Sequence, residues 1–294
     1  MPEQRSDPAM TIAFQGAPGA YSDLACRNVF PDMTSLPCAA FEDAFAAVRD
    51  GQARLAMMPI ENSVAGRVAD IHHLMPDSGL FIIGEHFERV EHHLLAPHGA
   101  SLKTIRTVRS HVHALGQCRN FIRAQGFTPI VAADTAGSAA EVAERRDPSV
   151  AAIASELAGE IYGLVSLAQN IEDAEHNTTR FLIMSREPQW SLQGRPTVTT
   201  FVFNVRNVSA ALYKALGGFA TNGVNMTKLE SYMVGGLFTA TQFYADVEAH
   251  PDDRPLKLAL EELAFFSTEV KILGVYPAHP ARIAAGQQNG GKPG

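Results

Sequence analysis

Two patterns of hydrophobic and polar positions divide the chain. Between residues 11 and 175, short apolar runs alternate with segments whose apolar residues recur every three or four positions, as on one face of a helix. The clearest is 41–51, where Phe41, Phe45 and Val48 share a face. Alternating strands and helices predict parallel α/β layers. We expect strands at 11–16, 54–62, 104–108, 128–134 and 149–154, and helices at 23–29, 41–51, 64–75, 112–126, 138–147 and 155–163.

The pattern changes after a linker at 186–196, which is rich in turn-forming residues and contains the single tryptophan. The segments that follow predict the order β-α-β-β-α-β, which is that of a ferredoxin-like domain. We expect its strands at 197–205, 224–234, 237–248 and 269–277, and its helices at 209–223 and 255–267.

The composition is typical of a soluble globular protein of about two domains. The chain has 294 residues, of which 46% are hydrophobic and 19% charged. A formal net charge of −7 argues against nucleic acid as a partner. Cys26, Cys38 and Cys118 show no C-x-x-C spacing and are interpreted as reduced structural thiols.

The ends of the chain carry no targeting signal that we can identify. The first ten residues lack the apolar stretch of a signal peptide, and no run of ~18 apolar residues could span a membrane. We therefore expect a cytoplasmic protein without a membrane partner. Residues 1–10 and the Gly- and Gln-rich residues 279–294 are expected to be disordered.

Hydroxyl or amide side chains follow several of the expected strands, just where a helix begins. Helix N-termini present free N–H groups that bind anions, and ligands of open α/β sheets lie at the carboxyl ends of strands. Each residue taken alone is better interpreted as a helix cap, but together they are compatible with an anion-binding cleft between two α/β blocks. They are Ser22, Asn62, Ser63, Ser110, Thr135, Ser138 and Ser155.

The stretch from Asn177 to Arg180 is unusual for the start of a strand. An edge strand needs neither two adjacent threonines nor the residues that flank them, whereas a site that holds an anion and donates a hydrogen bond could use all four. Glu61 is interpreted either as a buried acid that keeps its proton or as a solvent-facing residue. Gln117 lies two helical turns after Ser110, so both are expected on one side.

Several kinds of site are excluded or disfavoured. The glycines at 16–19 are spaced G-x-x-G rather than G-x-G-x-x-G, so a tight turn is favoured over a nicotinamide cofactor. Of the 11 histidines, six form three pairs one or two residues apart, at 72–73, 92–93 and 111–113. Side chains at these spacings diverge on a helix, so no metal site is expected. The chain contains no G-x-S-x-G motif that would indicate covalent catalysis. We expect no cofactor.

Five segments, in this order, resemble the prephenate dehydratase family: AFQGAPGAYS, PIENSVAGRV, SHVHALGQC, AAIASELAGEIYGL and NTTRF. The ferredoxin-like part resembles the ACT regulatory domain that follows this catalytic region, and no chorismate mutase domain precedes Thr11, as in the monofunctional form. The resemblance extends from Thr11 to Pro277.

The resemblance implies an architecture. The catalytic region, 11–190, would be bilobed like a periplasmic binding protein, with one α/β lobe formed by 11–96 and 176–190 and the other by 97–175. The ACT domain would occupy 196–277, and it would form a homodimer or homotetramer. The active site would lie in the cleft between the lobes.

The resemblance also implies a reaction and its residues. Prephenate would lose carbon dioxide and water to give phenylpyruvate, in L-phenylalanine biosynthesis, with feedback by L-phenylalanine. Thr179 is the family's catalytic residue, which we interpret as a hydrogen-bond donor to the leaving oxygen, with Glu61 as the proton source. The substrate would be bound by Asn62, Ser63, Ser110, Gln117, Thr178, Arg180, Phe181 and Ser22, although Arg180 could instead make a structural ion pair. The effector would be bound by Asn207, Ala210, Ala211, Leu212, Asn225, Glu230 and Ser231.

The sequence departs from the family in three motifs. Where the family has His-Pro-Gln, this chain has His111-Val112-His113. Where the family has Pro-Gly-Ala-Leu, residues 209–212 are Ser-Ala-Ala-Leu, and where it has Glu-Ser-Arg-Pro, residues 230–233 are Glu-Ser-Tyr-Met. The last two change the effector site, so phenylalanine is expected to bind less tightly than in relatives with the full motifs. The alternatives are an arogenate dehydratase and a non-catalytic protein that senses an aromatic acid.

Overall fold

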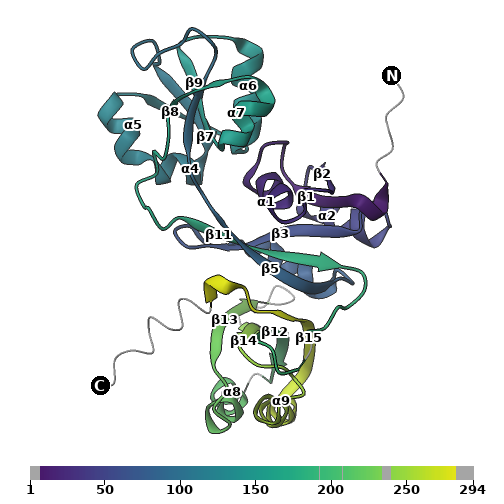
Figure 1. Ribbon diagram of the computed structural model, residues 1–294. Coiled ribbons are helices and arrows are strands. Elements are labelled where there is room, and N and C mark those ends of the chain that lie inside the picture. The colour runs from purple at the N-terminus through teal and green to yellow at the C-terminus, as the bar shows by residue number, and fades with distance from the viewer. Residues whose placement is uncertain (1–6, 192, 207, 234–239, 283–294) are drawn as a thin grey trace. The chain divides into compact units, whose positions relative to one another are not determined.

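The computed structural model describes residues 7–191, 193–206, 208–233 and 240–282. The chain forms two compact units (Figure 1). The first combines the residues up to Val68 with His86–Phe181, and the second combines Ala69–Glu85 with the residues from Leu182 onward.

The first unit contains two α/β lobes. In the first lobe, the central strand β1 (Thr11–Gln15) pairs in parallel with β2 (Thr34–Cys38) and β3 (Leu55–Asn62). β1 is buried along nearly its whole length, as expected for a parallel strand with both faces covered. Helices α1 (Tyr21–Val29) and α2 (Phe41–Arg49) connect these strands, and β11 (Thr178–Ser185) pairs with β3.

The second lobe has a five-stranded sheet in the order β10-β6-β9-β7-β8. Two clusters of buried side chains cover its faces, one with α4 and α5 and the other with α6 and α7 (Figure 1). Its elements are β6 (His93–Ala96), β7 (Thr107–His111), α4 (Val112–Gln117), α5 (Arg119–Gln125), β8 (Thr128–Ala132), α6 (Thr135–Arg145), β9 (Val150–Ala154), α7 (Glu156–Tyr162) and β10 (Val165–Ala168).

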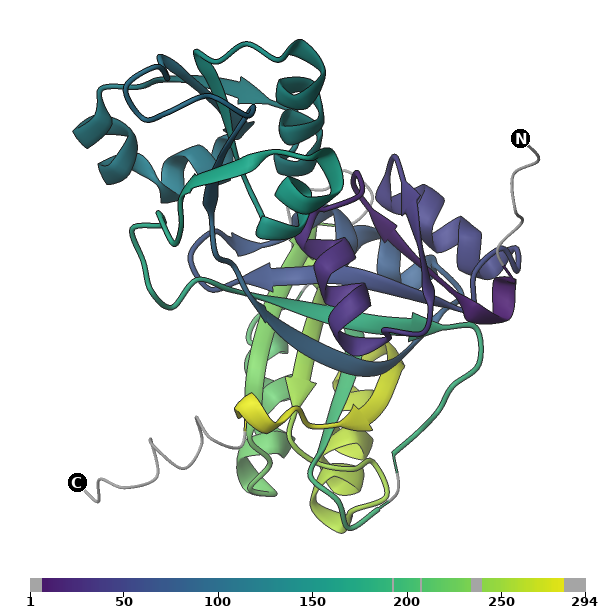
Figure 2. The ribbon, with the colours of Figure 1, turned by 45° about the horizontal axis from the view of Figure 1, so that its top comes forward.

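The second unit contains the expected β-α-β-β-α-β order, which confirms that part of the prediction. Its antiparallel strands lie in the order β13-β14-β12-β15, and helices α8 and α9 cover one face of this sheet (Figure 2). The elements are β12 (Thr197–Val205), α8 (Ala211–Thr221), β13 (Met226–Met233), β14 (Ala240–Val247), α9 (Arg254–Phe266) and β15 (Ser267–Pro277). The unit also contains α3 (Ala69–Leu74) and the start of β5 (Phe81–Arg89), whose Ile82 pairs with Gly274.

Three expectations about elements are corrected. The helix expected at 64–75 begins only at Ala69, because β4 (Gly66–Arg67) turns back to pair with β3. The helix expected at 112–126 breaks at Cys118, whose backbone has φ −112° and ψ 24°. The lobe boundary expected at residue 96 is too late, because β6 already pairs with β9 and β10.

Parts of both ends that were expected to be disordered are placed. Pro8–Met10 form a 3-10 turn, and the Asp7 carboxylate caps it by accepting a hydrogen bond from the Ala9 N–H. At the other end, His279 and Arg282 hydrogen bond to the buried Glu85. Residues 1–6 and 283–294 lie outside the described residues. None of the helices that the structure describes is long and apolar enough to cross a membrane.

Candidate active site

The candidate site is built on neighbouring strands β3 and β11. Asn62, at the end of β3, has a side chain whose orientation is fixed by hydrogen bonds. Asn62 Oδ1 accepts hydrogen bonds from the backbone N–H groups of Val64 at 2.9 Å and Ala65 at 2.7 Å. Only an oxygen can accept these bonds, so the orientation of the amide is determined. Its Nδ2 then donates to Asn177 Oδ1 at 2.8 Å and to Thr179 Oγ1 at 3.0 Å.

Thr179 is thereby prepared to act as a donor. Its hydroxyl oxygen accepts from Asn62 Nδ2, and a hydroxyl has one proton of its own, which Asn62 does not need. The side chain is partly exposed, on the same face of β11 as Asn177, two residues earlier. The geometry therefore orients the Thr179 oxygen and leaves its proton for another acceptor.

Asn177 supplies a second unused donor. The residue is 1% exposed, and its Oδ1 is occupied by Asn62, so its Nδ2 must point the other way. This nitrogen is buried and has no hydrogen-bond partner among the described residues. A buried donor without a partner typically costs about 1–3 kcal/mol, which a bound oxygen would recover. The sequence pattern drew attention to Asn177 but gave the residue no role. Its spacing of two residues from Thr179 could have indicated that the two side chains lie on the same side of the extended chain.

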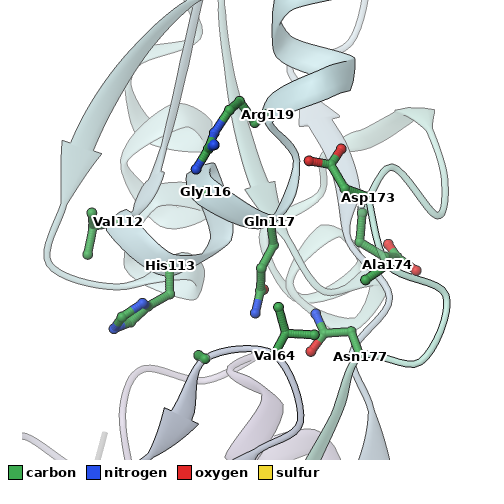
Figure 3. A pocket seen from close by; sticks show the side chains of 11 residues that line it. Val64, Val112, His113, Gly116, Gln117, Arg119, Asp173, Ala174 and Asn177 are labelled. Carbon is green, nitrogen blue, oxygen red and sulfur yellow. The ribbon is translucent and has the colours of Figure 1, made fainter.

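A cavity of about 540 Å³ lies beside these groups. Figure 3 shows Gln117 from α4 and Asn177 from the segment before β11 extending toward it, with Arg119 and Asp173 farther up. Arg119 is an exposed cation in the lining, and Glu172 and Asp173 contribute carboxylates. The lining consists of Val64, Ala65, Val112, His113, Gly116, Gln117, Arg119, Glu172, Asp173, Ala174 and Asn177.

Glu61 and Arg180 lie on the opposite face from Asn62 and Thr179. Side chains alternate along a strand, and Arg180 Nη1 pairs with Glu61 Oε1 at 2.9 Å. Arg180 is only 2% exposed, so the structural ion pair replaces the expected contact with a substrate carboxylate. A carboxylate bound to a guanidinium on the other face is also badly placed to supply a proton beside Thr179.

The other predicted substrate residues are mostly structural in their contacts. Ser110 is fully buried and donates to the Ile153 carbonyl at 2.6 Å. Ser63 donates to the His176 carbonyl at 2.7 Å and accepts the Thr178 N–H at 2.9 Å, which joins the end of β3 to β11. Ser22 and Phe181 are buried in the first unit and do not line the cavity.

The predicted helix caps are confirmed in one case. Ser155 caps α7 by accepting the Ala158 N–H, whereas α6 is capped by Asp134 rather than by Thr135 or Ser138. Ser155 Oγ also donates to the Gly19 carbonyl, and Tyr162 of α7 donates to the Pro18 carbonyl.

The loop at 16–19 forms the tight turn that the sequence favours. Gly19 has φ +87°, and a Cβ atom there would lie 2.7 Å from the Ala158 Cα. Glycine at this position thus allows α7 of the second lobe to approach the loop of the first. The same contact occupies the loop carbonyls through Ser155 and Tyr162.

The predicted effector residues lie in the second unit, except that Asn207 lies outside the described residues. Ala210 precedes α8 with φ 62° and ψ 16°, a left-handed conformation that glycine adopts more easily. Asn225 Nδ2 donates to Glu248 at 2.8 Å, and Glu230 lies 3.4 Å from the Lys228 ammonium. Ala211 is buried in the core of this unit, and Leu212 packs against it.

Comparison with known proteins gives a consistent family. The family model described as prephenate dehydratase matches residues 12–189. A protein of Komagataeibacter europaeus named bifunctional N-acyl-homoserine lactone acylase/prephenate dehydratase is 56% identical over 92% of this chain and 97% of its own length. Arogenate dehydratase/prephenate dehydratase 2 of Arabidopsis thaliana is 38% identical over 90% of this chain and 72% of its own length.

Two solved structures resemble this chain over most of its length. A structure described as a novel type of quorum quenching acylase is 55% identical, with a TM-score of 0.87 over 92% of this chain and 99% of its own. The prephenate dehydratase of Arthrobacter aurescens, solved in complex with L-Phe, is 31% identical, with a TM-score of 0.83 over 95% of this chain and 97% of its own.

Proposed function

The chain belongs to the prephenate dehydratase family, and we propose that it converts prephenate to phenylpyruvate, carbon dioxide and water. The observation that carries this proposal is the hydrogen-bonded set Asn62, Asn177 and Thr179 beside the cavity. The set leaves two donors, the Thr179 hydroxyl and Asn177 Nδ2, for the oxygens of a substrate. The enzyme is a carbon–oxygen hydro-lyase.

The reaction needs donors more than it needs a cofactor. Prephenate loses its ring carboxylate as carbon dioxide while the hydroxyl across the ring departs with one added proton as water, and aromatisation of the ring drives both. Thr179 donates a hydrogen bond to the departing oxygen, where negative charge develops. Asn177 Nδ2 donates a hydrogen bond to a substrate oxygen, and Gln117 positions the substrate ring. Arg119 pairs with a carboxylate of the substrate.

The carboxylates that line the cavity are relevant to whether the enzyme prefers prephenate or arogenate. Arogenate has an ammonium group where prephenate has a keto group, and Glu172 and Asp173 line the cavity together with Arg119. An ammonium group would find a carboxylate there, so a test must compare both substrates.

The purified protein is expected to form phenylpyruvate from prephenate without added metal or nicotinamide. Dialysis against a strong chelator should leave the rate unchanged, because the proposed donors are side chains of the protein. Arogenate should be assayed in parallel for phenylalanine formation, with Thr179→Ala as the negative control in both assays. If neither product formed, the proposed function would be wrong, and if a divalent ion were required, the mechanism would be wrong.

A second candidate is hydrolysis of N-acyl-homoserine lactones, which is favoured by the 56% identity to a protein named for both activities. The test is release of homoserine lactone from an acylated substrate. Two variants would locate the activity. Thr179→Ala changes the candidate site, whereas Ser166→Ala removes a serine whose Oγ lies 3.1 Å from His93 Nδ1 on the second lobe.

We further propose that residues 196–277 are an ACT domain that binds L-phenylalanine and forms a homodimer or homotetramer in the cytoplasm. Support comes from the β-α-β-β-α-β order and from the L-Phe complex of the Arthrobacter aurescens protein. The turn before α8, at Ala210, would hold the ligand carboxylate on backbone N–H groups, and Glu230 and Ser231 would face its ammonium group.

Phenylalanine is expected to inhibit the enzyme, and Ala210→Gly is expected to make it bind several-fold more tightly. Glycine suits the left-handed turn at Ala210 and removes the methyl group, so the ligand carboxylate can approach the backbone N–H groups more closely. Calorimetry and inhibition assays on both proteins would measure this change.

Ala210→Asp should weaken phenylalanine binding and leave uninhibited turnover unchanged. An intact protein that neither bound nor responded to millimolar phenylalanine would contradict the regulatory role.

A further inference from the structure

The hydrogen bonds of the candidate site continue beyond Gln117 to His92 and Tyr21. His92 directly precedes β6 and is 1% exposed. Its Nε2 lies 2.9 Å from Gln117 Oε1, and its Nδ1 lies 2.9 Å from the Tyr21 phenol oxygen. Glu172 fixes the His92 backbone by accepting its N–H at 2.9 Å.

The direction of these bonds follows from Asn62. Because Asn62 Oδ1 is held by two backbone N–H groups, the group that faces it from Gln117 must be the donor, Nε2, at a long 3.5 Å. Gln117 Oε1 then faces His92. A carbonyl oxygen only accepts, so His92 Nε2 must carry a proton.

The other ring nitrogen of His92 is an acceptor. Burial lowers the pKa of His92, which keeps the ring neutral and leaves Nδ1 without a proton. Burial, together with nearby acidic groups, raises the pKa of the Tyr21 phenol well above its ordinary value, so Tyr21 remains a donor. A carbonyl oxygen can only accept, so the single phenol proton is donated to the Glu91 carbonyl oxygen, 2.7 Å away. The contact with Tyr21 therefore leaves the tautomer of His92 to be set by Gln117.

We propose that His92 is a positioning residue that holds the Gln117 amide in one of its two orientations. The proposal rests on the proposed function. If the Gln117 amide turned over, its Oε1 would face Asn62 Oδ1, and two acceptors would repel each other. Asn62 would then hold Thr179 and Asn177 less firmly. His92 thus acts on the reaction through three side chains and need not touch the substrate.

The protonated nitrogen of His92 can be observed directly. Long-range ¹⁵N–¹H correlation spectra of the full chain with labelled histidine, assigned by the signals lost in His92→Asn, should show a proton on Nε2. The side-chain amide signals of Gln117 and Asn62 should shift in the same variant. A proton on Nδ1 alone would overturn the proposal.

Two substitutions of His92, whose side chains differ in length, distinguish a role in positioning Gln117 from a role in packing alone. The amide nitrogen of Gln can lie near the place of His Nε2, whereas that of Asn is too short to reach Gln117. His92→Asn is expected to lower kcat roughly 10-fold with KM changed by less than about twofold, the pattern of a misplaced catalytic group. His92→Gln should recover most of that loss.

The adjacent His93 provides the matched control. It is also buried, but it faces Ser166 rather than Gln117, so His93→Asn should leave kcat on prephenate nearly unchanged. Equal kcat in His92→Gln and His92→Asn would show that His92 only packs, and would overturn the proposal. If the wild-type protein turned over neither prephenate nor arogenate, the proposed function would fail, while the spectra would still decide whether His92 holds Gln117.

Discussion

Thr179→Ala is expected to lower kcat by roughly 10²-fold or more with little change in KM, as for the loss of one transition-state donor. Asn62 Nδ2 fixes the Thr179 oxygen, so the hydroxyl proton is aimed before the substrate arrives. Charge develops on the leaving oxygen only as its bond to the ring breaks. The hydrogen bond is therefore worth more in the transition state than in the bound substrate, and its loss appears in kcat.

Thr179→Ser and Thr178→Ala are the matched controls. Serine keeps the hydroxyl, so Thr179→Ser should retain much more activity than Thr179→Ala. Thr178 lies on the other face of β11 and holds Ser63 through its backbone, so Thr178→Ala should retain most of the activity. Steady-state kinetics on prephenate would test all three, and equal rates for the serine and alanine variants at 179 would refute the donor role.

Arg282→Ala is expected to destabilise the second unit by about 3–5 kcal/mol, the usual cost of removing one partner of a buried ion pair. Arg282 is 13% exposed, and its guanidinium lies 2.7 Å from Glu85 and 3.5 Å from Asp246, both of which are fully buried. Without Arg282, both carboxylates lose this cation. The thermal midpoint should fall by roughly 10 °C.

Lys257→Ala is the control for this experiment. Lys257 is an exposed residue of α9, and alanine suits a helix at least as well as lysine. Circular dichroism on heating would compare both variants with the wild-type protein. A midpoint for Arg282→Ala within about 2 °C of the control would mean that the carboxylates do not depend on Arg282.

The order of elements follows from local patterns, whereas their boundaries depend on tertiary contacts. The β-α-β-β-α-β order was predictable because each segment has its own period of apolar residues. The hairpin that interrupts 64–75 was not, because Gly66 and Arg67 pair with β3 and carry little apolar signal of their own. The short strand β6 was missed because four buried residues show no period.

The site was predictable in its segments but not in the roles of all its residues. The period of two along β3 and β11 separates Glu61 and Arg180 from Asn62 and Thr179, and it could have been applied to the sequence. The unused donor of Asn177 could not be found in this way. It depends on how the Asn62 amide is turned, which is determined by N–H groups of a loop that only the folded chain brings into place.

The contact of α7 with the loop at 16–19 determines which substitutions evolution can accept there. Both acceptors, the carbonyls of Pro18 and Gly19, belong to the backbone, and every amino acid supplies a carbonyl. Pro18 can therefore be exchanged for another residue while the bond from Tyr162 survives. Gly19 has no such freedom, because any larger residue meets Ala158. Among natural variants, the loop should thus tolerate exchange at Pro18, while Gly19 and the two donors on α7 should persist.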